Sequence, residues 1–263
     1  MKRPLIALLT DFGLADHYVA AMKGVILGIA PESQLVDISH EIGAYGIAEA
    51  AFTLSQAAPW FPPGTVHLVV VDPGVGSSRR PILSKAAGQY FVAPDNGVLT
   101  LVWESDPEWR AWEISVGARR SRQVSRTFHG RDIFAPTAAQ LALGARPGRL
   151  GRQVDDCQRL AIGGASRTGP KSWTGEILKI DRFGNAITSF PASLWGQIAR
   201  KPFVLKTSGQ EIHRAREAYA EGLPGELFII PGSTGFLEIA TNRGNAATLM
   251  GATPGAKVDI KIS

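Results

Sequence analysis

The stretch "VVVDPGVGSSRR", residues 69–80, indicates the fold of the first half of the chain. Its valines continue an apolar run that is typical of a strand buried on both faces, and Pro73-Gly74 predicts a turn directly after it. Asp72 therefore stands at the carboxyl edge of a sheet, where open α/β folds bind their ligands. From this segment alone Asp72 is either a turn-forming residue, the commoner role of Asp before Pro-Gly, or a chemical group.

Segments on both sides of this strand alternate between strand-like and helix-like patterns. Apolar runs that stop at turns predict strands, whereas apolar residues at helical spacing predict helices. The predicted strands are 5–11, 34–39, 65–72 and 89–97, and the predicted helices are 16–31, 46–60 and 131–144, the last provided that Pro136 lies in its first turn. Strand–helix–strand repetition implies a mostly parallel sheet with helices on both faces.

The pattern changes in the second half of the chain. A stretch rich in Gly, Arg, Pro and Ser is followed by short alternating strands with Gly and Asn turns, which is typical of a small β domain. We therefore predict an α/β catalytic domain over residues 1–160, a linker over 161–171 and a small C-terminal β-barrel-like domain over 172–263.

Composition places the chain among globular proteins, because 44% of its 263 residues are hydrophobic and 19% are charged. No apolar run reaches the ~18 residues that a membrane span requires. The N-terminus is typical of a first strand rather than of a signal peptide. The single cysteine, Cys157, excludes an internal disulfide and a cysteine-based zinc site, and it suits a reducing cytoplasm.

A net charge of +5 raises the hypothesis of a nucleic-acid partner. The arginines that cluster in one segment are Arg119, Arg120, Arg122, Arg126 and Arg131. The arginines of this segment do not alternate with aromatic residues, and the segment matches no nucleic-acid-binding motif. We therefore expect these arginines to form a solvated face and expect no nucleic-acid partner. The same positive field would suit an anionic or zwitterionic small ligand.

Three segments of the first half carry candidate chemical groups, each with a structural alternative. Asp11 in "LLTDFGLADHY" can cap the following helix through an Asx turn or accept hydrogen bonds from a ribose diol. Asp72 and Arg79 can pair, and an Asp–Arg pair lowers the carboxylate pKa, which suits positioning more than proton abstraction. His129 in "TFHGRDIF" directly precedes a predicted helix, where a structural and a chemical role are both open.

The segment "IDRFGNAIT" in the β domain has the composition of a hairpin. It also places Asp181 and Asn185 on one tight turn, which offers a carboxylate for an amine and an amide for the edge of an adenine. By contrast, "DPGVGSSRR" lacks the glycines of a dinucleotide fingerprint and the lysine of a P-loop, so it is a weak phosphate-binding signal.

Five motifs, "TDFG", "VVDPGVGSSRR", "APDNG", "FHGRD" and "DRFGN", follow one another along nearly the whole chain. In this order and spacing the chain resembles the adenosine-forming S-adenosyl-L-methionine (SAM) hydrolases, also called SAM hydroxide adenosyltransferases, which are siblings of the fluorinases and chlorinases. The resemblance implies hydrolysis of SAM to adenosine and L-methionine by in-line attack of an activated water on the ribose 5′ carbon. It implies no cofactor and no metal.

The resemblance also implies roles for individual residues. Water activation would fall to Asp72, Arg79 and His129, with either Asp72 or His129 taking the proton. The residues implied in substrate binding are Asp11 for the ribose hydroxyls, Tyr45 against the sugar, Asp16, Asp181 and Ser233 for the methionine amine and carboxylate, and Asn185, with Phe183 nearby and the backbone around Arg243, for the adenine.

Family members of this kind are homotrimers, with each site between the first domain of one subunit and the second domain of its neighbour. Two alternatives stay open, a SAM-dependent halogenase and a non-catalytic SAM or adenosine sensor. The halogenating relatives carry a tyrosine where this chain has Asp72, and the extra fluorinase loop is absent here. A carboxylate within ~4 Å of a halide would repel it by several kcal/mol at low effective dielectric, so Asp72 favours water as the nucleophile.

Overall fold

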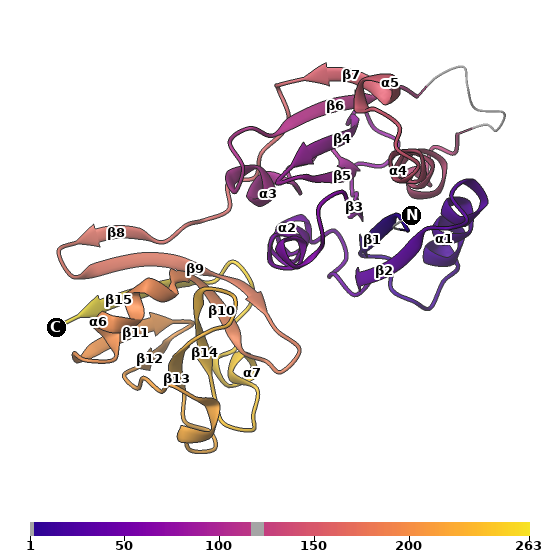
Figure 1. Ribbon diagram of the computed structural model, residues 1–263. Coiled ribbons are helices and arrows are strands. Elements are labelled where there is room, and N and C mark those ends of the chain that lie inside the picture. The colour runs from indigo at the N-terminus through magenta and orange to yellow at the C-terminus, as the bar shows by residue number, and fades with distance from the viewer. Residues whose placement is uncertain (1–2, 117–123) are drawn as a thin grey trace. The chain divides into compact units, whose positions relative to one another are not determined.

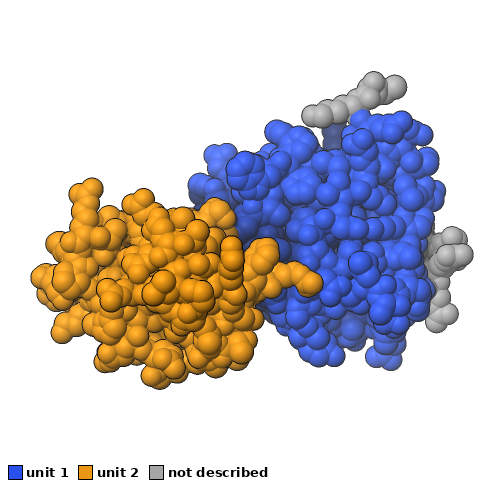
Figure 2. Space-filling model, turned by 90° about the horizontal axis from the view of Figure 1, so that it is seen from below, with its two compact units in different colours: residues 1–160 blue, residues 161–263 orange. Residues whose placement is uncertain are grey.

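The computed structural model describes residues 3–116 and 124–263 and divides into two compact units, residues 1–160 and 161–263 (Figure 2). Arg119, Arg120 and Arg122 of the arginine cluster lie outside the described residues. Each unit has its own sheet and its own hydrophobic core.

A seven-stranded sheet forms the centre of the first unit (Figure 1). Its strands are β1 Leu5–Thr10, β2 Gln34–Ser39, β3 Val66–Val70, β4 Pro81–Ala86, β5 Gln89–Pro94, β6 Arg110–Ile114 and β7 Gly151–Val154. Their order in the sheet is β2-β1-β3-β5-β4-β6-β7. The pairs β2–β1, β1–β3 and β3–β5 are parallel, and the pairs β5–β4, β4–β6 and β6–β7 are antiparallel. Because β6 runs with the parallel set, the sheet is mostly parallel, as predicted.

Helices cover both faces of this sheet. One face packs against α1 (Tyr18–Ile29) and α4 (Ala135–Ala142), and the other against α2 (Ile47–Ala57) and α3 (Thr100–Glu104). The shorter elements are the 3₁₀ turn Ala58–Trp60 and α5 Pro147–Leu150. In the ranges that the structure describes, no helix is both long enough and apolar enough to cross a membrane.

Strand β3 shows why the valine run is uninterrupted. Val66, Leu68 and Val70 join the core under α1 and α4. Val69 and Val71 join the core under α2 and α3. Since successive side chains of a strand point to opposite faces, a strand covered on both sides is apolar at nearly every position, and His67 is the one polar residue of β3.

The helix predicted over 131–144 begins as a π-helical turn, Gly130–Phe134, and continues as α4 with Pro136 in its first turn. Such π turns often lie at functional sites. Strands β4, β6 and β7 and helix α3 were not predicted. Strands β4, β6 and β7 include exposed positions and α3 has only five residues, so these elements lack the apolar runs that predicted β1 and β3.

The second unit is an antiparallel sheet that nearly closes on itself. Its strands are β8 Ser166–Gly169, β9 Ser172–Ile180, β10 Ala186–Pro191, β11 Phe203–Thr207, β12 Gln210–Ile212, β13 Phe228–Pro231, β14 Phe236–Ala240 and β15 Lys257–Ile262. The order β12-β11-β15-β9-β10-β14-β13 leaves β12 and β13 at the two edges. The chain just after β12 reaches β13, because Arg216 N donates to Ile229 O (2.9 Å) and Ile229 N donates to Arg214 O (2.8 Å). This confirms the predicted barrel-like fold.

Short helices complete the second unit: α6 Trp195–Ile198, α7 Ala246–Met250 and 3₁₀ turns at Ala192–Leu194 and Tyr219–Glu221. Residues 161–171, which we expected to be a linker, fall within this unit and contain β8, which pairs with β9. The side chains of β8 are mostly exposed, so the sequence there has no alternating apolar pattern to reveal a strand.

His67 in β3 provides a test of the first unit's core. Its ring is fully buried and stacks on Phe91, and its Nε2 donates to Gln89 Oε1 (3.0 Å). Burial lowers the pKa of His67 from 6.5 to about 4. The unfolded chain therefore binds a proton at higher pH than the folded chain does.

We expect the free energy of unfolding to fall by about 3 kcal/mol from this one group as the pH drops from 6.5 to about 4. Urea unfolding at a series of pH values measures it. The variant His67→Phe should lose that part of the pH dependence, whereas the exposed control His213→Phe should keep it. Equal pH dependence in His67→Phe and the wild type would show that His67 is not buried in its neutral form.

Candidate active site

Two strands of the first unit deliver carboxylates to the same edge of the sheet. β1 and β3 are parallel neighbours, and Thr10 at the end of β1 is in register with Val70 at the end of β3. Asp11 is the first residue after β1, and Asp72 is the second residue after β3. This is the carboxyl edge, where parallel sheets of this kind bind ligands.

Arg79 joins Asp72 and His129 into one hydrogen-bonded group. Its Nε donates to Asp72 Oδ1 (2.9 Å) and its Nη2 donates to Asp72 Oδ2. Nη2 also donates to His129 Nδ1 (2.9 Å). The Arg79 and Asp72 side chains are only 7% and 5% exposed, so this is a buried ion pair. The structure thus brings together the three residues that the resemblance implies in water activation.

The hydrogen bond from Arg79 fixes the protonation of His129. A guanidinium has no acceptor, so Nδ1 must carry a lone pair, and the proton of the neutral ring lies on Nε2. Burial lowers the pKa of His129, the positive charge of Arg79 lowers it further, and Asp72 and Asp132 oppose this. His129 is therefore neutral at neutral pH, and its Nδ1 is occupied.

One nitrogen of Arg79 is left over. Nη1 is buried and has no hydrogen-bond partner among the described atoms. An unmade hydrogen bond to a buried charged group is costly, so Nη1 marks a place for a ligand oxygen. The guanidinium also lies over the ring of Phe134, 5.2 Å from its centroid, which holds it from the side of the π-helical turn.

The loop between Asp72 and Arg79 depends on glycine. Gly76 has φ +79°, and a Cβ there would lie 2.5 Å from Arg126 O. Ser77 Oγ donates to Gly74 O (2.7 Å) and accepts from Arg79 N (3.2 Å). The "PGVGSS" segment is therefore a tight structural turn that returns Arg79 to Asp72, rather than a phosphate cradle.

Asp11 and Tyr45 are also brought together, since Tyr45 N donates to Asp11 Oδ2 (2.9 Å). Asp16 is exposed on the loop between β1 and α1, and among the described residues it forms no hydrogen bond with either of them. Phe12, next to Asp11, lies 6.2 Å from Phe128, next to His129, in an edge-to-face contact. This contact links the end of β1 to the segment that carries His129.

Backbone strain coincides with two candidate residues. In the described ranges the non-glycine residues with positive φ are Tyr45, Ala87, Ser208 and Arg243. Ala87 and Ser208 each precede a glycine in a two-residue hairpin, where positive φ is expected. Tyr45 (φ +66°) and Arg243 (φ +52°) lie outside such hairpins, and both are implied in substrate binding. Strain of this kind is often held at functional sites.

The "APDNG" motif has a structural role in this chain. Arg80 donates through Nε and Nη2 to Asp95 Oδ2 (2.9 and 2.6 Å) and through Nη1 to Asp156 Oδ1 (2.7 Å). Asp95 Oδ1 accepts from Gln158 N (2.8 Å). This network secures the end of the first unit, so of the two neighbouring arginines only Arg79 belongs to the candidate active site.

In the second unit, the remaining candidates surround one cavity of about 770 Å³. The predicted residues that line it are Asp181, Phe183, Asn185, Ser233 and Arg243. They come from the β9–β10 hairpin, the β13–β14 turn and the segment after β14, which are far apart in the sequence.

The turn that carries Asp181 and Asn185 is closed on itself. Asp181 Oδ1 accepts from Phe183 N (2.9 Å) and Asn185 N (2.8 Å), and Asp181 Oδ2 accepts from Asn185 Nδ2 (2.9 Å). The carboxylate of Asp181 is therefore largely used by its own turn. The pairing orients the amide of Asn185, whose Oδ1 and second N–H remain for a ligand.

The sequence analysis missed four polar residues that line the same cavity: Tyr219, Thr234, Glu238 and Thr241. Tyr219 Oη donates to Glu238 Oε2 (2.8 Å). Glu238 could have been noticed, because it is a charged residue within the apolar strand "FLEIA". Tyr219 lies in an irregular loop, where no sequence pattern marks it.

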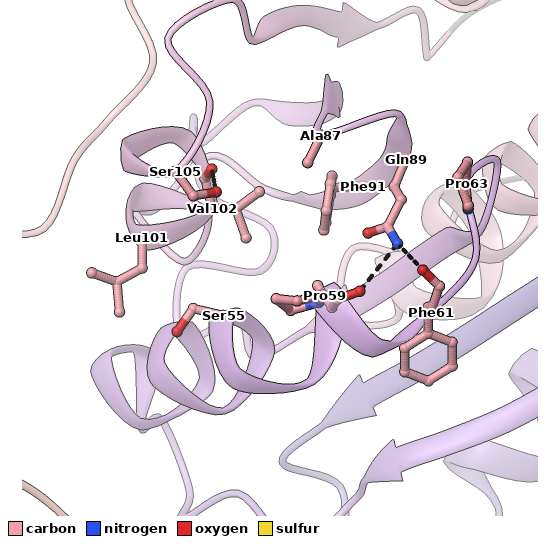
Figure 3. Close-up of a pocket in the computed structure, with 11 residues that line it drawn as sticks. Ser55, Pro59, Phe61, Pro63, Ala87, Gln89, Phe91, Leu101, Val102 and Ser105 are labelled. Carbon is pink, nitrogen blue, oxygen red and sulfur yellow. Dashed lines mark hydrogen bonds between the residues drawn. The ribbon is translucent and has the colours of Figure 1, made fainter. Parts of the chain in front are cut away.

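Another cavity, of about 360 Å³, lies in the first unit between α2, α3 and the start of β5 (Figure 3). Its main polar group is Gln89, whose amide donates to Ala58 O (3.0 Å) and Phe61 O (2.8 Å). The predicted site residues do not line it. Within residues 3–116 and 124–263, no group of three His, Cys, Asp or Glu side chains is placed to hold a metal ion.

Comparison with known proteins identifies the family of the chain. The SAM hydroxide adenosyltransferase N-terminal domain matches residues 6–151, and the SAM hydroxide adenosyltransferase C-terminal domain matches residues 175–259. The chain belongs to the SAM hydroxide adenosyltransferase family.

Individual relatives cover most or nearly all of the chain. The (R)-S-adenosyl-L-methionine hydrolase of Thermus thermophilus is 39% identical over 95% of this chain and 96% of its own length. A fluorinase of Nocardia brasiliensis is 28% identical over 72% of this chain and 71% of its own length. An uncharacterized conserved protein from Thermotoga maritima, a crystal structure, has a TM-score of 0.90 and 38% identity over 97% of this chain and 99% of that chain.

The Arg79–His129 contact can be tested without any substrate. Replacing Arg79 by Met removes a positive charge that lowers the pKa of His129, so His129 should take up its proton at higher pH. Titration of the ring C–H signals by NMR measures this, with His129→Asn to assign the signal. The control is Arg80→Met, which removes a neighbouring arginine that contacts Asp95 instead. No shift in Arg79→Met, or an equal shift in the control, would contradict the geometry.

Proposed function

We propose that this protein hydrolyses SAM to adenosine and L-methionine. The observation that carries the proposal is the Asp72–Arg79–His129 group, with its buried ion pair and the unpartnered Nη1 of Arg79, in a chain of this family. The relatives named (R)-S-adenosyl-L-methionine hydrolase support it. Their name specifies one configuration at the sulfonium, and we extend that preference to this chain.

The three residues of the group would divide the work on the reacting water. Nη1 of Arg79 would donate to the water oxygen and stabilise the hydroxide that develops as the 5′ carbon is attacked. Nδ1 of His129 already accepts from Arg79, whereas each Asp72 oxygen keeps a free lone pair. We therefore assign proton acceptance to Asp72 and a positioning role to His129. The carbon–sulfur bond breaks, methionine leaves as a neutral thioether, and the proton passes to solvent.

The charge balance suits a dry site. The substrate carries a sulfonium cation at the reacting centre, and attack by hydroxide cancels that charge. A low-dielectric environment favours such a step because separated charges are lost as the bond forms. Holding water and carbon in line would supply the largest share of the rate enhancement. Proton removal would add roughly 10²- to 10⁴-fold.

A halide is a poor fit to the same place. Asp72 fills two donors of Arg79, so the pair is close to neutral and offers no net positive charge to an anion. Asp72 distinguishes the chain from its halogenating relatives, which carry a tyrosine in place of Asp72, as noted in the sequence analysis. We therefore favour hydrolysis over halogenation and over a sensor that leaves SAM intact.

We further propose a cytoplasmic homotrimer in which the second unit of one subunit completes the site on the first unit of its neighbour. Tyr45 and Phe183 are 72% and 78% exposed, which suits aromatic residues that a ligand or a neighbouring subunit covers. In this assembly Asn185 and Phe183 would meet the adenine and Asp11 the ribose. Burial raises the pKa of the free Cys157 thiol to about 11, which suits a thiol kept reduced.

Incubation of the purified protein with SAM in ¹⁸O-labelled water tests the reaction. Adenosine should carry the label at its 5′ oxygen, the (R) epimer should react faster, and excess chloride should give no 5′-chloro-5′-deoxyadenosine. Asp72→Asn and Arg79→Met should each slow turnover by about tenfold or more, because each removes part of the water-binding group. The exposed Arg149→Met serves as control. A chlorinated product, unlabelled adenosine or intact SAM would each refute hydrolysis.

Complementation tests the shared site. Arg79→Met damages the first unit and Asn185→Ala the second, so each protein alone should be slow at SAM below its KM. In trimers formed by co-expression, about a quarter of the sites should pair two intact units, because cyclic assembly is random. Light scattering should give the mass of three chains. An active monomer, or no recovery in mixed trimers, would contradict the proposal.

A further inference from the structure

Glu238 is a buried carboxyl group on the wall of the second unit's cavity. It is 4% exposed, and Tyr219 Oη donates to its Oε2 (2.8 Å). Its other oxygen, Oε1, lies against Gly232, where a Cβ would collide with the carboxyl group. Gly232 directly precedes Ser233, so Glu238 lies beneath the β13–β14 turn that forms this end of the cavity.

The charge of Glu238 is not balanced by the protein. Among the described residues, no lysine or arginine forms an ion pair with Glu238, and Arg243, on the same cavity wall, is exposed. Burial raises the pKa of Glu238, its hydrogen bond from Tyr219 lowers it, and the negative charge of Asp181 raises it. A buried unpaired charge costs several kcal/mol, so a cationic ligand group is the partner that would offset this cost.

A second, independent observation indicates a ligand at the same wall. Thr241 is 3% exposed and lines the cavity, and its Oγ1 has no hydrogen-bond partner among the described atoms. The Oγ1 of Thr234, also on the cavity wall, is likewise buried and unpartnered. Buried hydroxyls are normally hydrogen-bonded, so these two are placed for polar atoms that the protein does not supply.

We propose that Glu238 binds the α-ammonium group of the amino-acid part of the substrate, and that Tyr219 is the residue that positions the Glu238 carboxylate. This inference rests on the proposed function for the identity of the ligand. It differs from the assignment that the resemblance implies, in which Asp16, Asp181 and Ser233 hold the methionine amine and carboxylate. Asp181 already accepts three hydrogen bonds within its own turn, whereas Oε1 of Glu238 is not occupied by such a turn.

The alternative partner of Glu238 is the exocyclic amine of adenine. That amine is neutral, so it would leave the buried carboxylate charge uncompensated, whereas an ammonium group neutralises it. A charge-assisted hydrogen bond is also roughly twice as strong as a neutral one. The two alternatives predict different behaviour toward ligands that share the nucleoside and differ in the amino-acid part.

Calorimetry with two thioether nucleosides separates them. S-adenosyl-L-homocysteine carries the aminobutyrate, and 5′-methylthioadenosine carries a methyl group in its place, with the same uncharged sulfur. We expect Glu238→Gln to weaken binding of the first by about tenfold or more and to leave binding of the second within about twofold. Tyr219→Phe should weaken only the first as well, by about two- to tenfold. The exposed control Glu211→Gln should change neither.

Circular dichroism melting of each variant accompanies the binding measurements. Equal losses for both nucleosides would mean that Glu238 contacts the nucleoside, and unchanged binding of both would mean that it contacts no ligand; either result overturns the proposal. The proposed function fails differently. A wild-type protein that binds S-adenosyl-L-homocysteine but forms no adenosine from SAM would refute the hydrolase function and leave the assignment of Glu238 to stand on the binding data.

Discussion

The buried ion pair between Arg79 and Asp72 is the interaction on which the candidate site depends. Removing both charges from water costs several kcal/mol for each ion, so the pair is tolerable only because further contacts support it, while Nη1 stays open for a ligand. Asp72 takes two bonds from Arg79, His129 takes another, and the ring of Phe134 covers one face. The end of β3, the glycine-containing turn and the π-helical segment must therefore all be in place before the pair can form.

The same hydrogen bonds limit what His129 can do. Because Arg79 donates to His129 Nδ1, the histidine cannot bind a proton there without losing the bond that orients it. Asp72 receives both of its bonds from one guanidinium and keeps lone pairs on both oxygens. A histidine with an ordinary pKa near neutrality would look like the natural base from sequence alone. If the proposed function holds, this geometry favours the carboxylate of Asp72 as the proton acceptor instead.

The features predicted correctly from sequence are those encoded locally. The valine run fixes β3 as a doubly covered strand, and the Pro-Gly turn places Asp72 at its end. Features that arise from pairing between distant segments were not visible. β8 is recognisable only by its pairing with β9. The different roles of Arg80 and its neighbour Arg79 are visible only from the contacts of Arg80 with Asp95 and Asp156. Tyr219 lies in a loop and contacts Glu238 only in the folded chain.

Charge is divided differently between the two units. The first holds an almost neutral Asp–Arg pair, whereas the cavity of the second has two carboxyl groups on its wall, Asp181 and Glu238, and one exposed arginine, Arg243. If the protein hydrolyses SAM, this difference matches what happens to the two cationic groups of SAM in the reaction. The sulfonium charge is lost in the reaction, so an unpaired carboxylate that formed an ion pair with it would stabilise the bound substrate more than the transition state and slow the reaction. The ammonium charge is unchanged throughout, so a carboxylate that binds it strengthens binding of substrate and transition state alike.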